Sequence, residues 1–274
     1  MGRRLEGYRA LVTGASSGIG ASLARQLAAR GCNLVLTARR EDRLRQLADE
    51  LGPKHGVDVR VVQGDLSQPG AATALFERTE GEGLAIDLLV NNAGLGAWRT
   101  FVAAPWEMHE TEIRVNLVAL THLTSLFLPG MVERRRGHVM NVASIGAYTP
   151  CPNFAVYAAT KAYVRNFTEA LDHELRGSGV RAISICPGGT KTEFFMVSGQ
   201  RIKASGDKMM MSAERCAAIA VRKMLAGRRN VVTGWLNALG MWLLRIVPRA
   251  WMPWVAERTL AMTVERPAAN ALHG

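Results

Sequence analysis

The sequence predicts one α/β domain built on a doubly wound parallel sheet with helices on both faces. From residue 8 to about residue 188, short apolar runs alternate with longer segments of helical period. Gly, Asn, Asp or Pro bounds these runs, which is typical of buried parallel strands. The 274 residues contain no Pro/Ser-rich linker and no internal repeat. Uninterrupted alternation of this kind indicates a single sheet with crossover helices packed on its two sides.

The expected elements can be placed in order along the chain. Strands are expected at residues 10–14, 33–38, 58–64, 86–92, 137–144 and 180–188, and a short strand at 230–234 could close the sheet edge. Helices rich in Ala and Leu are expected at 19–30, 41–51, 70–81, 106–133, 153–175 and 212–226. Residues 190–211 have no clear period, as expected of a mobile lid over a site or of an ordinary surface loop.

Composition and charge exclude several classes of protein. A formal charge of +11 would suit a nucleic-acid or membrane binder, but the basic residues are scattered and 28 of the 34 are arginines, which indicates genome composition bias. We therefore expect no nucleic-acid partner. The cysteines are far apart and lack metal-ligand spacing, so they favour a reducing compartment and no metal site. A strand-like run begins by residue 8, so no signal peptide is expected and the cytoplasm is the default location.

A glycine-rich turn, "TGASSGIG" at residues 13–20, joins the first expected strand to the first expected helix. Gly14 permits the tight turn, while Gly18 and Gly20 let a pyrophosphate approach the backbone and the helix pack on the sheet. The helix N-terminus offers free N–H groups and a positive dipole to the phosphates. This placement predicts a dinucleotide site that includes Gly14, Ser16, Ser17, Gly18, Ile19 and Gly20.

The end of the second expected strand bears on the choice of cofactor. An acidic residue at this tip would hold the ribose hydroxyls and favour NAD, but the tip reads Ala38-Arg39-Arg40. Two guanidiniums could clamp a 2′-phosphate, so we expect NADP(H) rather than NAD(H). If both arginines are merely solvated, the choice of cofactor stays open. Glu41 and Asp42 fit better as acidic first-turn residues of the next helix.

Two further strand ends lie at the same edge of the expected sheet as Gly14. Asp65 and Leu66 close the third strand, where an adenine would lie, and Asn92, Ala93 and Gly94 close the fourth. Taken alone, either group of residues could simply form the turn that follows a strand. Open α/β sheets bind ligands at the carboxyl ends of their strands, so we expect these residues to line the cofactor path.

Six motifs follow one another between residue 8 and about residue 192. They are "TGASSGIG" (13–20), "NNAG" (91–94), Asn116 in "VNL", Ser144 in "NVAS", "YAATK" (157–161) and "PGGTKT" (187–192). In order and approximate spacing this set resembles the short-chain dehydrogenase/reductase family, with no departure at the catalytic positions. The resemblance implies a Rossmann-like fold, a nicotinamide cofactor, and a homodimer or homotetramer paired through helices at 107–133 and 154–177.

Tyr157 and Lys161 are four residues apart, so on a helix they share a face, whereas Tyr163 points elsewhere. A free tyrosine has a pKa near 10, too high for a general base at neutral pH. A cation at about 4 Å is worth at most ~4 kcal/mol at an effective dielectric of 20, which would lower that pKa. We therefore expect Tyr157 to exchange a proton with a carbonyl or alcohol oxygen, and Tyr163 to serve packing or an interface.

The resemblance also assigns roles to the remaining motif residues. It implies that Lys161 reaches the nicotinamide ribose, that Ser144 donates to the substrate oxygen, and that Asn116 holds a water linking Lys161 to solvent. It further implies a nicotinamide pocket shaped by Pro187, Gly188, Thr190 and Thr192. Any one of these residues alone would be explained by packing or by the formation of a turn. Their joint occurrence favours an enzyme over a purely structural role.

The last 40 residues are unusually apolar. Trp235, Trp242, Trp251 and Trp254 lie there with Arg245, Arg249 and Arg258, and Pro248 and Pro253 are expected to break any helix. We treat residues 1–234 as the catalytic domain and 235–274 as an extension with three open interpretations. It is an apolar substrate cap or oligomer interface, a membrane-surface segment, or a disordered tail. The first two suit a bulky apolar substrate, as do Trp98, Phe194, Phe195, Met196 and Met209–Met211.

These observations predict an NADP(H)-dependent oxidoreductase that interconverts a ketone or aldehyde and an alcohol. A lipid-like, steroid-like or aromatic substrate is expected. The alternatives are a non-catalytic NADP-sensing protein and a membrane-surface scaffold on the same fold. A sensor needs the glycine loop but not Ser144, Tyr157 and Lys161 together, so the complete set favours the enzyme.

Overall fold

The computed structural model describes residues 5–265. Its centre is a seven-stranded parallel sheet with the order β3-β2-β1-β4-β5-β6-β9. The strands are β1 (Arg9–Thr13), β2 (Asn33–Thr37), β3 (Val59–Val61), β4 (Leu88–Asn91), β5 (Gly137–Val142), β6 (Val180–Cys186) and β9 (Asn230–Val232). The chain starts in the middle, winds outward through β2 and β3, and then returns to build the other half from β4. The doubly wound parallel sheet and the single domain are therefore confirmed, as is the edge strand near residue 230.

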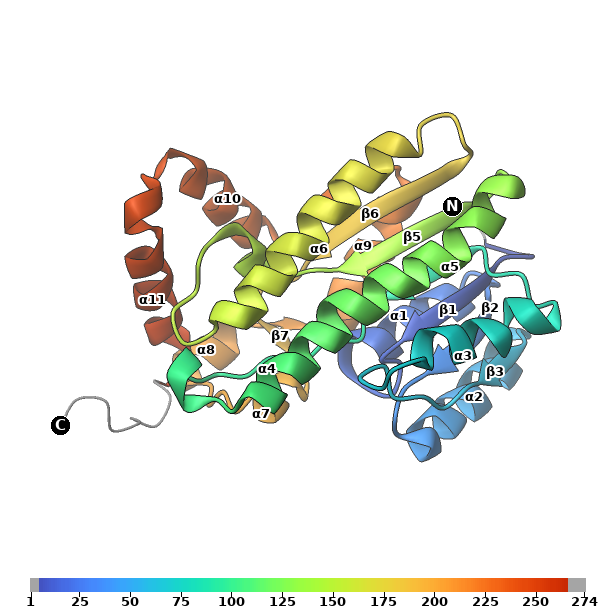
Figure 1. Cartoon of the computed structure of the whole chain (residues 1–274), viewed down its shortest axis with the longest axis horizontal. Coiled ribbons are helices and arrows are strands. Elements are labelled where there is room, and N and C mark those ends of the chain that lie inside the picture. The colour runs from blue at the N-terminus through green and yellow to red at the C-terminus, as the bar shows by residue number, and fades with distance from the viewer. Residues whose placement is uncertain (1–4, 266–274) are drawn as a thin grey trace.

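Helices cover both faces of this sheet (Figure 1). One face carries α1 (Gly18–Ala28), α2 (Glu41–His55) and α9 (Ala213–Leu225). The other carries α3 (Ala71–Glu77), α5 (Leu120–Glu133) and α6 (Ala155–Glu174). In a right-handed crossover the direction of winding sets the face on which the helix lies. The helices α1 and α2 therefore share one face, and α3, α5 and α6 lie on the other after the chain reverses direction at β3.

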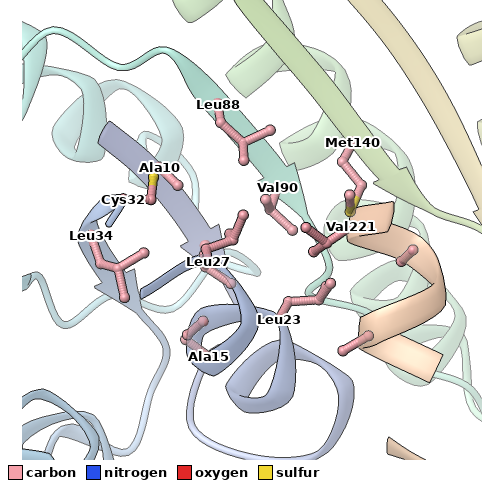
Figure 2. Close-up of a cluster of buried hydrophobic side chains, with 14 of the residues drawn as sticks. Ala10, Ala15, Leu23, Leu27, Cys32, Leu34, Leu88, Val90, Met140 and Val221 are labelled. Carbon is pink, nitrogen blue, oxygen red and sulfur yellow. The ribbon is translucent and has the colours of Figure 1, made fainter. Parts of the chain in front are cut away.

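The side-chain alternation of β1 shows how one strand serves two cores. Ala10 and Val12 face a cluster formed with Leu23 and Leu27 of α1 and Val221 of α9, part of which Figure 2 shows. Leu11 points to the opposite face and joins the second cluster. That second cluster also contains Val35, Leu89, Val139, Leu75, Leu123, Phe127 and Leu171. Near-continuous apolar strands follow directly from burial on both sides.

The long helix expected at 106–133 is interrupted by a local change of winding. It consists of α4 (Trp106–Ile113), a π-helical turn η3 (Arg114–Ala119) and α5. Trp106–Glu133 is long and apolar enough by composition to cross a membrane, yet Leu123 and Phe127 pack in the sheet core. π-helical turns of this kind are frequent at functional sites, and this one contains Asn116.

Residues 190–211 are not the irregular loop that their lack of periodicity suggests. They contain β7 (Thr190–Lys191), α7 (Phe194–Val197) and α8 (Ala204–Met209), and β7 pairs with β8 (Met211–Ser212). The elements are too short to produce a readable period. We call residues 190–211 the lid.

The extension is helical where the structure describes it. It forms α10 (Trp235–Leu243), η5 (Leu244–Ile246), η6 (Arg249–Trp251) and α11 (Met252–Thr263), and residues 266–274 lie outside the described chain. Pro248 ends the first helical stretch as expected, but the expectation for Pro253 is wrong. Pro253 occupies the first turn of α11, where no backbone N–H donor is needed. Figure 1 shows α10 and α11 at one end of the molecule, with α2 and α3 at the other.

Candidate active site

A pocket of about 560 Å³ opens at the carboxyl ends of the strands. Its walls come from the glycine loop, the ends of β2 to β6, the lid and the extension. Most of the cofactor residues expected from the sequence line it: Gly14, Ser16, Ser17, Gly18, Ile19, Arg39, Arg40, Asp65, Leu66, Asn92, Ala93, Gly94, Pro187, Gly188, Thr190 and Thr192. Segments distant in sequence therefore meet at one edge, as the parallel topology requires.

The glycine loop leaves its backbone open to the pocket. Gly14 has a φ of +65°, and a Cβ there would lie 2.9 Å from the Cα of Ala93. A Cβ on Gly20 would lie 2.3 Å from the carbonyl oxygen of Gly14, so Gly20 holds the first turn of α1 against the loop rather than facing the pocket. The loop and the N-terminus of α1 together fit a pyrophosphate.

The two arginines at the tip of β2 differ in their surroundings. Arg39 is exposed at the pocket rim. Arg40 donates to the hydroxyl oxygens of Ser16, at 3.2 and 3.3 Å, and of Ser17, at 2.9 Å. It also pairs with the lid carboxylate of Glu193 at 2.7 Å. The tip is therefore basic, as expected, but the lid contributes a carboxylate to it.

The ends of β3 and β4 complete the cofactor edge of the pocket. The Asp65 carboxylate accepts from the backbone N–H of Ser67 at 3.0 Å, and Asp65 and Leu66 both line the pocket. The Asn92 side chain donates to the carbonyl oxygens of Thr13, at 2.9 Å, and Gly14. Asn92 thus fixes the β4 end to the glycine loop.

Tyr157 and Lys161 point the same way from α6, as their spacing predicts. Both are buried, and the Lys161 ammonium lies 5.7 Å from the centre of the Tyr157 ring. The Lys161 Nζ atom donates to the carbonyl oxygen of Val142 at 2.9 Å. Tyr163 faces away, is exposed, and lies 3.0 Å from the Thr121 hydroxyl through its own hydroxyl. The helix therefore separates the two tyrosines as expected.

The expected lowering of the Tyr157 pKa is wrong for this arrangement. Burial raises the pKa of Tyr157, and a hydrogen bond with Ser144 offsets only part of that effect. Burial also lowers the pKa of Lys161 to about 8, which weakens it as a source of positive charge. The apolar walls thus outweigh the cation, and the phenol stays protonated at neutral pH.

Asn116 is buried beside the site without lining the pocket. Its side chain accepts from the backbone N–H of Leu95 and donates to the Leu95 carbonyl oxygen, both at 2.9 Å, and donates to the Thr160 hydroxyl at 3.0 Å. These bonds occupy the amide, so the side chain positions Leu95 and α6. The water expected to link Asn116 and Lys161 stays a prediction.

The segment after β6 forms the wall opposite the glycine loop. Pro187 accepts from the backbone N–H of Ile145 at 2.9 Å, and the Thr190 hydroxyl donates to Gly188 at 2.9 Å. A Cβ on Gly188 would lie 2.2 Å from the amide nitrogen of Asn237, which belongs to α10. The extension therefore closes directly onto the expected nicotinamide pocket.

One end of the pocket is apolar. Phe154 stacks on Tyr157 with ring centres 4.2 Å apart, and Phe194 of the lid lies 5.4 Å from Tyr157. Phe194, Phe195, Met209 and Met210 line the pocket with Leu260 and Val264 of the extension. Three residues expected to contact substrate do not line it. Trp98 is buried against Phe154, Met196 is exposed on the lid, and Met211 lies in β8.

Comparison with known proteins identifies the family. Residues 8–203 match the family model described as short chain dehydrogenase. The chain belongs to the short-chain dehydrogenase family. It is an oxidoreductase that binds a nucleotide cofactor, and the non-catalytic alternative has no support among its relatives.

The curated relatives of this dehydrogenase are named for different substrates. A 7beta-hydroxysteroid dehydrogenase of Collinsella aerofaciens is 33% identical over 83% of this chain and 89% of its own. The NADP-dependent 3-hydroxy acid dehydrogenase YdfG of Salmonella typhi is 38% identical over 76% of this chain and 82% of its own.

Solved structures agree on the fold and differ in cofactor. A short-chain dehydrogenase from Sphingobium yanoikuyae in complex with NADPH has a TM-score of 0.78 at 31% identity, covering 89% of this chain and 97% of its own. A 7beta-hydroxysteroid dehydrogenase structure has a TM-score of 0.84 at 30% identity, covering 93% and 99%. A family member from Burkholderia phymatum in complex with NAD has a TM-score of 0.79 at 25% identity, covering 88% and 94%.

Three residues of the dehydrogenase site were missed in the sequence. The Thr13 hydroxyl accepts from the backbone N–H groups of Asn92 and Ala93, both at 3.0 Å, and donates to Val90. Glu193 pairs with Arg40 from a distant segment, and no sequence signal links the two. Glu112 has a detectable signal, since it is a carboxylate one helical turn before Asn116 and shares the helix face of that residue.

Glu112 is buried, and one of its carboxylate oxygens has no hydrogen-bond partner. Burial raises the pKa of Glu112 to about 7, although the charge of Lys161 acts to lower it. In turn the Glu112 carboxylate raises the pKa of Lys161 and of Tyr157. A second titratable group thus lies within electrostatic reach of the tyrosine–lysine pair.

Proposed function

We propose that this dehydrogenase uses NADP(H) to interconvert a hydrophobic ketone and its alcohol, with Tyr157 as the proton donor and acceptor. One observation carries the proposal. The Tyr157 phenol lies between the glycine-loop end of the pocket and the apolar end formed by Phe154 and Phe194. A proton-transfer group at that junction can serve a carbonyl carbon that faces a nicotinamide.

The residues present fit the cofactor, because the glycine loop leaves its backbone and the N-terminus of α1 open to the pocket. When bound, the nicotinamide supplies or accepts the hydride. The Tyr157 phenol, kept protonated by burial, gives its proton to the oxygen of the reduced substrate. The Ser144 hydroxyl holds the same oxygen and polarises the carbonyl.

Lys161 supports this proton transfer from the same face of α6. Its ammonium group near the Tyr157 ring stabilises the phenolate left after proton donation. Its bond to Val142 orients it toward the end of β5, where Ser144 begins the next turn. Asn116 acts as a positioning residue through Leu95 and Thr160.

NADP(H) is proposed over NAD(H) on the chemistry of the β2 tip. Arg39 and Arg40 can each donate hydrogen bonds from a guanidinium group to a 2′-phosphate. The Ser16 hydroxyl, which lies beside Arg40, can donate another. The tip itself carries no carboxylate to bind a free 2′-hydroxyl. The NADP-dependent relative and the NADPH complex support this choice, while the NAD complex shows that the fold alone does not decide it.

A bulky apolar substrate is proposed because lid and extension both present apolar side chains to the pocket. Phe194 reaches it from α7, Met210 from the turn after α8, and Leu260 from α11. A steroid-like, lipid-like or aromatic ketone matches such walls, and the steroid dehydrogenase relative supports the class. We place the protein in the cytoplasm as a homodimer or homotetramer, with the exposed Val118 and Tyr163 at the helical interface.

A panel of ketones and alcohols of graded size, followed by NADPH absorbance, tests the function. Bulky apolar ketones should give a higher kcat/KM than small or charged ones, and NADPH should outperform NADH. Preference for NADH would refute the cofactor assignment, and preference for small polar substrates would refute the substrate class. Absence of turnover across the panel, with cofactor bound, would favour a sensor.

A further inference from the structure

The extension exposes an unusual amount of apolar surface. Four tryptophans on α10, η6 and α11 are largely exposed: Trp235 by 72%, Trp242 by 60%, Trp251 by 64% and Trp254 by 58%. Leu236, Leu239, Leu243, Ile246 and Met262 are exposed with them. We call these nine side chains the tryptophan face. Isolated exposed apolar residues need no explanation, but so many on one 28-residue stretch indicate a binding surface.

The backbone below the tryptophan face is held in place. Lys203 donates its backbone N–H to Thr263 at 2.9 Å and its ammonium to Ala261 at 2.6 Å. Ile202 forms a β-bridge with Val264. The Asn237 side chain of α10 packs closely against Gly188. The tryptophans therefore project from an ordered segment fastened to the lid and to the main domain.

The charge on this segment has one sign over most of its length. From residue 235 to residue 256 the chain contains no Asp or Glu, while Arg245 and Arg249 are both exposed. Glu257 is followed by Arg258, whose guanidinium lies 4.7 Å from the Trp254 ring centre. The apolar side chains are thus interleaved with cations.

This charge pattern distinguishes between occupants. A two-fold interface with a second copy would bring the same patch against itself, placing Arg245 and Arg249 of one copy near those of the other. An anionic lipid surface instead complements both the exposed apolar side chains and the arginines. Tryptophan rings prefer the headgroup depth, and arginine stems extend along apolar surface while the guanidinium reaches phosphate.

We propose that the tryptophan face docks the protein on an anionic lipid bilayer, with the helices lying in the interface plane. The inner sides of the same helices line the pocket through Asn237, Thr259 and Leu260. Docking brings the apolar end of the pocket close to the bilayer surface, where apolar molecules partition. The docking itself does not depend on the proposed reaction.

The full-length protein is incubated with vesicles of phosphatidylcholine alone and of phosphatidylcholine with phosphatidylglycerol, and binding is measured by cosedimentation and tryptophan emission. We expect binding to the anionic vesicles at least tenfold tighter than to neutral ones, with a blue-shifted emission. Equal or absent binding to both kinds of vesicle would overturn the proposal.

Two variants test the two components of the surface. Trp242→Ser with Trp251→Ser should lose most vesicle binding, and Arg245→Gln with Arg249→Gln should weaken it roughly thirtyfold on anionic vesicles. Matched controls are Val102→Ser, at an apolar residue 75% exposed on η2 (Phe101–Ala103), and Arg176→Gln with Arg228→Gln. Those two arginines precede β6 and β9, at the opposite edge of the sheet from the pocket.

Thermal unfolding and circular dichroism of every variant establish that the substitutions leave the fold intact. Controls that bind as weakly as the tested variants would overturn the assignment of the face. Light scattering supplies the remaining comparison: if the tryptophan variant changes a dimer to a monomer while the parent ignores vesicles, the face is a protein interface and the proposal is wrong.

Discussion

Arg40 at the tip of β2 and Glu193 in the lid form an ion pair with a separation of 2.7 Å. Arg43 pairs with the same carboxylate, and the two arginines, Arg43 first, lower the pKa of Glu193 to about 2. Glu193 is therefore charged at every physiological pH. A lid carboxylate thus occupies one of the guanidiniums that we assign to the 2′-phosphate.

Replacing Glu193→Gln should strengthen NADPH binding about fivefold and leave NADH binding unchanged. The substitution removes a negative charge that a 2′-phosphate would meet at Arg40, and exposed ion pairs are worth about 1 kcal/mol or less. Fluorescence titration with both nucleotides measures the effect. Weaker NADPH binding would mean that Glu193 holds the lid closed over the cofactor instead.

Replacing Arg39→Gln and Arg40→Gln together should raise the KM for NADPH by about 10- to 100-fold while changing that for NADH little. Each charged hydrogen bond to a phosphate is worth about 1.5–3 kcal/mol, and part of that is recovered by water. Arg45→Gln is the matched control, since Arg45 is an exposed arginine of α2 paired with Glu41. An equal loss for both nucleotides would show a structural role.

The buried Glu112 should make the stability of the protein depend on pH. Its pKa is raised from 4.5 to about 7, so between these values the folded protein keeps a proton that the unfolded chain has released. The free energy of unfolding therefore falls as pH rises through this range, by up to about 3 kcal/mol from this group.

Replacing Glu112→Gln should remove that pH dependence. Relative to the parent, the variant is expected to gain about 3 kcal/mol between pH 4.5 and pH 8, as measured by urea unfolding at the two pH values. Glu107→Gln, at an exposed position of α4, serves as the control. A parent and variant with parallel pH profiles would show that Glu112 is ionised in the folded protein like an exposed carboxylate.

Replacing Ser144→Ala should lower kcat by about 10²- to 10³-fold with little change in nucleotide binding. The hydroxyl is proposed to hold the substrate oxygen as charge develops on it, and such donors act mainly in the transition state. Ser144 also accepts from the backbone N–H of Gly146 at 3.1 Å, so thermal unfolding should accompany the kinetics. A change confined to KM would contradict the assigned role.

Much of the fold and part of the site could be predicted because the signals are local. Apolar runs bounded by turn residues mark the parallel strands, and helical spacing places Tyr157 and Lys161 on one face. The position of the glycine turn between a strand and a helix predicts the open backbone at Gly14.

What could not be predicted depends on contacts between distant segments. Arg40 and Glu193 are 153 residues apart in the chain, and no periodicity relates them. The raised pKa of Tyr157 follows from its burial beside Phe154 and Phe194, and Phe194 lies 37 residues away in the chain. Pro253 was expected to break a helix because its place in the first turn of α11 is invisible without the helix boundary.

The most direct test of the proposed chemistry is single-turnover ketone reduction by the Tyr157→Phe protein, with NADPH binding measured in parallel and Tyr163→Phe as the control from the same helix. The phenyl ring keeps the packing against Phe154 but cannot give a proton. We predict a rate lower by about 10²- to 10⁴-fold, unchanged NADPH affinity, and normal activity of the control. A Tyr157→Phe protein that reduces the ketone at the parent rate would contradict the assignment of Tyr157 as the proton donor.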